Sequence, residues 1–526
     1  MSALAGAPTL ARLALRRDRV RLPVWIGSIV ALVVVTAATI RGLYPTPAAL
    51  AAAAVVVENN PTALVMNGPA QGLRTLGGRV AFEVGAFGGV VVALMNIFLV
   101  GRHTRAEEES GRTELVRAAI TGRHAPLAAA LGVAAATDVL LAAVIAGGLV
   151  ALGLPVVGAL TLGAGIGSVG LVFAAVTALT AQVTEHTRGA YGLAITVLGA
   201  AFVLRAAGDV GDGTLSWFSP IGWAQAAQPF AGERTWPLLL ALGAVASLGA
   251  GAVVLGGRRD VGAGLVRPRP GPGFASAGLL RPLGLAVRLQ RGSLAAWSAA
   301  VFLVGVAYGS IAPDIGDLVA GSDDMAQFFG SAGAGLTDAF LGTALLILAL
   351  IGSGYAVQAA LRPRIEETAG RAEPLLATAL SRSRWAGAHV TVALLGSAVV
   401  LAAGGLGTGL GYAAVGGGTG QVLRLLGAAL VHAPAVWVLV GAIVTLIGVA
   451  PRAAAAGWAL LGGCFVVAIL GPLLGLPGWV SGVSPFQHVP QLPAAELTAV
   501  PLVTLAAVAC VLLATGLAGL RRRDIG

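Results

Sequence analysis

The chain has 526 residues, of which 57% are hydrophobic and only 11% are charged, and its mean hydropathy is +0.88. A water-soluble fold of this length needs far more charge to cover its surface, so the composition excludes a soluble globular protein and indicates a polytopic membrane protein. The formal net charge is +10, and all 33 basic residues are arginines. They lie at the ends of apolar runs rather than in one basic patch, which excludes nucleic acid as the expected partner.

Apolar runs of about 20 residues, the length that spans a membrane, occur six times in each half of the chain. In the first half we expect spans at 22–40, 84–101, 127–152, 156–181, 190–206 and 237–256. In the second half we expect them at 294–312, 340–361, 386–412, 424–449, 454–475 and 499–519. The first run follows a basic N-terminus, as in a signal peptide, but it is long enough to span and lacks a convincing cleavage site. We therefore predict an all-α membrane protein with 12 transmembrane helices.

One charge-dense segment occurs twice, once after the second span of each half. Residues 105–123 read R-A-E-E-E-S-G-R-T-E-L-V-R-A-A-I-T-G-R, and residues 364–382 read R-I-E-E-T-A-G-R-A-E-P-L-L-A-T-A-L-S-R. A constant offset of 259 matches Arg105 with Arg364, Glu107 with Glu366, Glu108 with Glu367, Gly111 with Gly370, Arg112 with Arg371, Glu114 with Glu373, Ala118 with Ala377 and Arg123 with Arg382. Such a match between charged segments in a chain poor in charge indicates an internal duplication.

Other pieces repeat in the same order. A short basic amphipathic stretch precedes the first span of each half, at 8–21 and at 281–293, and we expect it on the inner membrane surface. Arg258-Arg259-Asp260-Val261-Gly262, after the sixth span, is echoed by Arg522-Arg523-Asp524-Ile525-Gly526 after the twelfth. We therefore divide the chain into a first half at 1–257, a linker rich in Gly, Pro and Arg at 258–280, and a second half at 281–526. Six spans in each half make the two repeats parallel, as a pseudo-dimer.

The distribution of arginine sets the expected orientation. If both termini are cytoplasmic, 27 of the 33 arginines lie in cytoplasmic segments, as the positive-inside rule requires. Both charged segments, 102–123 and 362–384, then lie in the cytoplasm. An even number of spans keeps the two termini on that same side.

The charged segments have the features of a docking surface. Glutamates and arginines at near-helical spacing pair within one element and with a partner, and the glycine permits a tight bend between two short helices. The alternative is a solvated cytoplasmic loop that obeys the positive-inside rule. That alternative explains the arginines but not the matched glutamates and glycine, so we favour docking.

An amphipathic stretch, six spans and an E-E-x-x-G-R-x-E segment after the second span resemble the ABC-2 type permeases of ABC exporters, and the fused twelve-span form is similar to actinobacterial antibiotic and multidrug exporters. The resemblance covers essentially the whole chain. It implies that the amphipathic stretches are interface helices, that the charged segments are coupling helices seated in an ATPase subunit, and that the protein lies in the bacterial plasma membrane as a multi-pass protein. The implied coupling positions are Arg105, Glu107, Glu108, Gly111, Arg112 and Glu114, with Arg364, Glu366, Glu367, Gly370, Arg371 and Glu373. The second copy departs from the first at Thr368 and Pro374, which replace Glu109 and Leu115.

A nucleotide site is missing from the sequence. A Walker A loop needs a lysine to hold the phosphates, and the chain contains no lysine. We therefore expect no cofactor in this chain, no enzyme activity of its own and no metal site, with ATP and Mg bound by a separate ATPase. Two docking segments imply two ATPase copies per permease.

Polar residues inside the predicted spans include Asn96 and Gln358, and two ionisable ones are candidate site residues. Asp138 lies near the middle of the third span and His432 lies within the tenth, where ionisable groups are costly and often functional. One interpretation places them on the translocation path or in a proton relay. The other makes them hydrogen-bonded residues that join helices.

These observations leave three functions to compare. The leading hypothesis is an ABC exporter permease that moves hydrophobic or amphipathic compounds out of the cell. The alternative is a proton-coupled secondary drug transporter that uses Asp138, although residues 107–114 do not fit the loop pattern typical of the major facilitator class. A membrane enzyme acting on lipids would need a cluster of His, Asp or Glu at one membrane face, and the sequence shows no convincing one.

Overall fold

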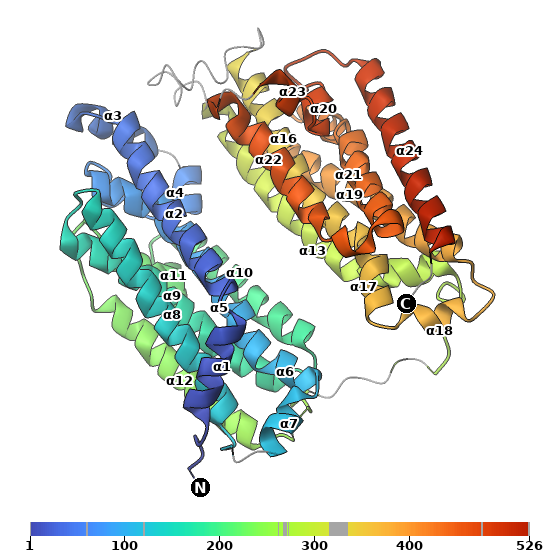
Figure 1. Cartoon of the computed structure of the whole chain (residues 1–526). Helices are drawn as coiled ribbons and strands as arrows, with labels where there is room; N and C mark the ends of the chain where they lie inside the picture. The colour runs from blue at the N-terminus through green and yellow to red at the C-terminus, as the bar shows by residue number, and fades with distance from the viewer. Residues whose placement is uncertain are drawn as a thin grey trace. The chain divides into compact units, whose positions relative to one another are not determined.

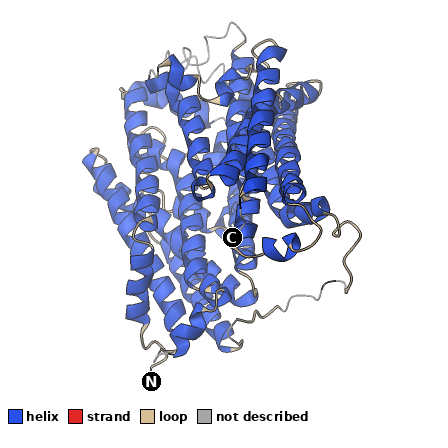
Figure 2. Cartoon of the chain, turned by 45° about the vertical axis from the view of Figure 1, so that its right-hand side comes forward, coloured by secondary structure: helices blue, strands red, loops and turns tan. Residues whose placement is uncertain are grey.

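The computed structural model describes residues 2–58, 61–118, 121–260, 262–266, 271, 273–314, 335–474 and 477–523. In this part of the chain all regular structure is helical, as Figure 2 shows. Eleven of the described helices are long and apolar enough to cross a membrane. This agrees with the all-helical, polytopic architecture that the composition predicts. The twelfth span stays a prediction, because α22 (Ala456–Leu474) is not among the eleven.

The chain divides into two compact units, Met1–Pro270 and Gly271–Gly526, which are described separately. Figure 1 labels their helices. The first unit contains α1 (Ala7–Arg17), α2 (Arg21–Leu43), α3 (Pro47–Glu58), α4 (Pro61–Asn67), α5 (Leu76–His103), α6 (Arg105–Glu109), α7 (Arg112–Ala118), α8 (Ala125–Ala151), α9 (Val156–Val183), α10 (Thr187–Val210), α11 (Pro220–Ala226) and α12 (Pro237–Gly257). The second contains α13 (Pro282–Ile311), α16 (Leu336–Ala360), α17 (Arg362–Thr368), α18 (Ala372–Leu376), α19 (Arg382–Ala414), α20 (Gln421–Leu430), α21 (Ala433–Val449), α22, α23 (Gly478–Ser481) and α24 (Ala499–Arg522).

The centre of the first unit is formed by α5 and α9, the two most buried of its membrane-length helices. They pack against each other, and α2, α8 and α12 pack around them. Small residues allow the close approach: a Cβ added at Gly163 of α9 would lie 2.5 Å from the carbonyl oxygen of Ala142 in α8. Such contacts let helices associate where lipid provides no hydrophobic drive.

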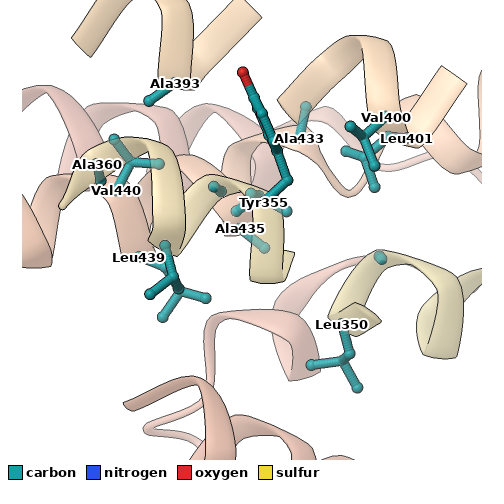
Figure 3. Close-up of a cluster of buried hydrophobic side chains, with 14 of the residues drawn as sticks. Leu350, Tyr355, Ala360, Ala393, Val400, Leu401, Ala433, Ala435, Leu439 and Val440 are labelled. Atoms are coloured by element: carbon teal, nitrogen blue, oxygen red, sulfur yellow. The ribbon is translucent and has the colours of Figure 1, made fainter. Parts of the chain in front are cut away.

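The centre of the second unit is formed by α16, α19 and α21. Figure 3 shows part of this core, with Tyr355 of α16 among small and branched apolar side chains such as Val400 and Val440. The Tyr355 hydroxyl donates a hydrogen bond to the carbonyl of Val392, 3.3 Å away. α13 packs along α19, and α24 packs along α21.

In two of the helices that extend beyond their predicted spans, an internal ion pair includes residues of the added turns. α5 begins at Leu76 rather than at residue 84, and Arg79 pairs with Glu83 within it at 2.7 Å. α10 reaches Val210 rather than residue 206, and Arg205 pairs with Asp209 at 3.2 Å. An ion pair four residues apart removes much of the cost of placing each charge on the helix.

The predicted span at 424–449 corresponds to the membrane-length segment Gln421–Val449. A turn at Val431 and His432 divides this segment into α20 and α21. Pro434 lies in the first turn of α21 and has no N–H to continue the preceding helix.

The amphipathic stretches of the two halves also differ. In the first half α1 ends at Arg17 and α2 begins at Arg21, with Pro23 in its first turn. In the second half the stretch predicted at 281–293 is not a separate helix, because α13 runs without a break from Pro282 to Ile311. Ala295 stands where the repeat would place a second copy of Pro23, and alanine continues a helix that proline interrupts.

Candidate functional site

The charged segment of the first unit consists of two short helices, α6 and α7, joined by Ser110 and Gly111. Gly111 has a φ of 73°, in the left-handed region that glycine adopts without the steric cost of a Cβ. The second unit repeats this arrangement with α17 and α18, where Gly370 has a φ of 67°. Each segment is therefore a helix, a glycine bend and a second helix.

A largely covered carboxylate joins the first segment to the end of α12. Glu108 accepts from Arg105 at 2.6 Å and from both terminal nitrogens of Arg259 at 2.8 Å. Arg105 is 0% exposed and also donates to the backbone carbonyls of Glu185, Gly262 and Ala263. A two-pronged contact between arginine and carboxylate is among the stronger ion pairs in proteins. The residues Arg105, Glu108 and Arg259 are called the first triad below.

The second unit contains the corresponding triad at the end of α24. Glu367 forms an ion pair with Arg364 at 3.1 Å and accepts a hydrogen bond from Arg523 at 2.6 Å. The carboxylate of Glu367 is 4% exposed. The offset of 259 relates Arg364 and Glu367 to Arg105 and Glu108, and the repeated Arg-Arg-Asp sequence relates Arg523 to Arg259. The residues Arg364, Glu367 and Arg523 form the second triad.

A second ion pair crosses the glycine bend in both segments. Glu107 lies 2.7 Å from Arg17 of α1 and 3.7 Å from Arg112, on the far side of Gly111. Its counterpart Glu366 contacts Arg371 at 2.6 Å, on the far side of Gly370. In the second unit, Arg362 provides the additional contact, at 2.7 Å. The hydrogen bond and the charge of Glu366 raise the pKa of Arg371.

The second helix of each segment presents the same positions outward. The corresponding residues Thr113 and Ala372 are buried. The exposed pairs are Arg112 and Arg371, Glu114 and Glu373, Leu115 and Pro374, and Ala118 and Ala377. Leu115 is 77% exposed although it lies beyond the end of α5, outside any membrane-length helix. An exposed apolar residue flanked by charges on such an element is typical of a contact surface.

The two segments differ at one anchoring contact. Glu109 accepts from the backbone N–H of Thr187 at 2.9 Å and so links α6 to the start of α10. Thr368, at the matching position, donates to the carbonyl of Arg364 in its own helix at 2.9 Å. The first segment therefore has an attachment that the second lacks at this position.

The structure changes the interpretation of several predicted coupling residues. Arg105, Glu108 and Glu367 face inward and bind other parts of their own unit, so their side chains are not the outward contacts that the docking hypothesis assigns to charged residues. Arg259 and Arg523 belong to the same two triads and were not predicted from the sequence. The signal was present, since both belong to the repeated Arg-Arg-Asp sequence that follows the last helix of each half.

Within the membrane-length helices, the structure brings Asp138 of α8 to Asn96 of α5. The amide nitrogen of Asn96 donates to Oδ1 of Asp138 at 2.9 Å and to the carbonyl of Val92 at 3.1 Å. Asp138 is 1% exposed. Gly170 of α9 covers the pair so closely that a Cβ there would lie 2.6 Å from Oδ1 of Asp138. This polar pair joins α5 and α8, and α9 packs over it.

His432 belongs to the second unit, between α20 and α21. It is 1% exposed, and its Nδ1 lies 3.2 Å from the carbonyl oxygen of Ala428. Asp138 and His432 thus sit in different units, each within its own helix packing. Among the residues that the structure describes, no three His, Cys, Asp or Glu side chains gather as a metal site would require.

In the described part of the chain, eleven membrane-length helices, with charged segments tied to helix ends by ion pairs, define a multi-pass membrane protein. Residues 279–521 match the family model described as the C-terminal domain of multidrug efflux system permease Rv1217c. The chain is also 40% identical over 529 residues to the multidrug efflux system permease protein Rv1217c of Mycobacterium tuberculosis (strain ATCC 25618 / H37Rv), a match that covers 100% of this chain and 96% of that protein. The chain therefore belongs to this family of multidrug efflux permeases, in agreement with the resemblance to ABC-2 type permeases. Its class is transport rather than catalysis.

Proposed function

We propose that the chain is the membrane-spanning permease of an ATP-driven exporter in the bacterial plasma membrane. A separate ATPase binds and hydrolyses ATP with Mg, and two copies of it dock on the two charged segments. The cargo is a hydrophobic or amphipathic compound taken from the cytosol or the inner leaflet and released outside.

The observation that carries the proposal is the correspondence between the two charged segments. Each has a helix, a glycine bend, an inward carboxylate in a triad and an outward face with the same exposed positions. A solvated loop needs neither the bend nor the buried triad. Two similar rigid surfaces on one chain favour two copies of one partner over a single asymmetric partner.

The lack of lysine supports a separate ATPase, since the phosphate-binding loop of such enzymes needs that residue. The family match supports drug efflux as the process, because the relative in Mycobacterium tuberculosis is named a multidrug efflux system permease. Outward transport rests on the same name. The substrate class rests on the chemistry that multidrug efflux implies.

The test is purification of the tagged chain from its native membranes in mild detergent, followed by identification and quantification of the proteins that accompany it. We expect an ATPase at about two copies per permease, as two docking segments imply. Reversing the exposed charges Glu114 and Glu373 together to arginine should remove it, since both side chains point outward.

The matched control reverses two exposed acidic residues, one in each half, that lie in predicted external loops: Asp212 and Glu496. This variant should retain the ATPase. Recovery of the permease alone from wild-type membranes, together with transport driven only by a proton gradient, would replace the proposal with the secondary-transporter alternative.

A further inference from the structure

Each charged segment is fixed at two points to the end of the last helix of its own unit. At its start, the first triad joins Glu108 to Arg259, which follows α12 directly. At its end, Arg123 donates to the backbone carbonyl of Gly257, the last residue of α12, at 2.7 Å. Arginine close to the C-terminal carbonyls of a helix is favourable for both hydrogen bonding and the helix dipole.

The second unit has the same two attachments. Glu367 pairs with Arg523, which follows α24, at 2.6 Å. Arg382, the counterpart of Arg123, donates to the backbone carbonyl of Arg523 at 2.7 Å. In each unit, the two contacts involve residues that are distant in the sequence, and both lie at the end of the unit's last helix.

We infer that Arg259 and Arg523 are positioning residues that make the last helix of each unit move together with its charged segment. The inference rests on the proposed function, because it needs an ATPase to displace the segment. Neither arginine touches the partner in this scheme. Their task is to transmit a displacement from the segment into the membrane-length helices.

The last helix of each unit packs in turn against a helix of that unit's core. α12 lies along α9, and Arg259 also donates to the side chain of Gln182 at the end of α9, at 2.7 Å. α24 lies along α21 so closely that a Cβ at Gly516 would be 2.5 Å from the backbone of Val444. Helices in such close contact shift as one body, because packed interfaces resist gradual deformation.

The chain supplies a matched control beside each positioning residue. Arg258 and Arg522 carry the same charge, precede Arg259 and Arg523 by one residue and have exposed side chains. Replacing either by glutamine removes one positive charge from the same helix end and leaves the triad intact. Any difference in transport between these control variants and Arg259→Gln or Arg523→Gln then results from loss of the triad rather than from the change in net charge.

The experiment uses the complete permease–ATPase complex in proteoliposomes, with the fluorescent cation ethidium as the transport probe. For Arg259→Gln, Arg523→Gln and the double variant, the ATPase content, the basal rate of ATP hydrolysis and the ethidium moved per ATP hydrolysed are measured. We expect normal ATPase content and at least about a fivefold loss of ethidium moved per ATP, the lower end of ordinary coupling between sites. Arg258→Gln and Arg522→Gln should match wild type.

The inference is overturned if the triad variants move as much ethidium per ATP as the controls. It is also overturned if they lose the ATPase, since the arginines would then shape the docking surface itself. Absence of an ATPase from the wild-type complex is a separate result that rejects the proposed function. Should Arg259→Gln fail to reach the membrane, Arg259→Lys keeps the charge, gives up the two-pronged contact and is judged by the same comparison.

Discussion

A single hydrogen bond between Asp138 and Asn96 is the central polar contact of the first unit's helix packing. The sequence identified Asp138 as an ionisable residue within a span, but it did not predict that Asn96 would be its partner. The pairing depends on how α5 and α8 are rotated against each other, and Gly170 of α9 makes the space for it. Rotation of helices about their axes comes from packing, which a single sequence does not reveal.

Because the pair is enclosed between helices and Asn96 donates to Oδ1 of Asp138, we expect it to act in stability rather than in proton transfer. Asp138→Asn keeps an oxygen that accepts from Asn96, so it should change the free energy of unfolding by no more than about 1 kcal/mol and preserve ATP-driven transport. Asp138→Leu removes the acceptor and should cost about 1–3 kcal/mol. Thermal unfolding in detergent and ethidium transport measure both effects.

A folded Asp138→Asn protein without transport would show that the carboxylate itself is needed on the path. Loss of a flux that a proton gradient drives without ATP would assign Asp138 to the coupling of a secondary transporter.

At the scale of elements, each charged segment depends on one glycine. Gly111 and Gly370 adopt positive φ values, and a Cβ at either position would meet no atom within 4 Å. The cost of replacing them is therefore one of backbone conformation and not of crowding. The bend was predictable from the glycine in each motif, whereas the inward direction of Glu108 and Glu367 was not.

Replacing Gly111 or Gly370 by alanine should destabilise the bend by about 1–2 kcal/mol, the usual cost of left-handed backbone for a residue with a Cβ. The outward helix should then lose its fixed orientation, and less ATPase should be recovered with the purified permease. Asparagine tolerates the left-handed conformation better than alanine does, so the asparagine variants should retain more ATPase than the alanine variants.

The control for this prediction is Gly132→Ala in α8, where the glycine is helical and open space surrounds it. That change should leave ATPase recovery unaltered. Equal recovery from the Gly111→Ala and Gly132→Ala variants would mean that the bend has no part in docking.

Some differences between the predicted spans and the observed helices involve residues that are recognisable in the sequence. Pro434 follows the turn within the predicted tenth span, and the Arg79–Glu83 pair lies in the turns that lengthen the second. In contrast, α3 and α4 lie between two predicted spans and were not predicted at all. Such short helices depend on local packing, here around Leu73 and Phe82, which composition alone does not indicate.

For the whole molecule, composition and hydropathy were sufficient to predict an all-helical membrane protein, because burial in lipid leaves few other ways to satisfy the backbone. The grouping of charged segments with helix ends in each unit was only partly predictable. Its members come from distant parts of the chain, such as Glu108 and Arg259, which lie 151 residues apart.

The number of spans determines on which side the chain ends. The 19 residues of α22 give a helix of about 28 Å, close to the thickness of the hydrocarbon core. We therefore expect α22 to cross the membrane and the C-terminus to be cytoplasmic. A fluorescent protein that folds only in the cytoplasm should be bright when fused after residue 526 and dark when inserted in the loop between α23 and α24. The reverse pattern would show that α22 does not span.

The difference between Pro23 and Ala295 has a mechanical consequence. In the second unit we expect a displacement of residues 282–293 to pass along α13 with little loss, because one continuous series of backbone hydrogen bonds connects them. In the first unit we expect the interruption between α1 and α2 to let the two helices move partly independently. The two halves should therefore respond unequally to the same displacement, and two copies of either half should not reproduce the movement of the pair.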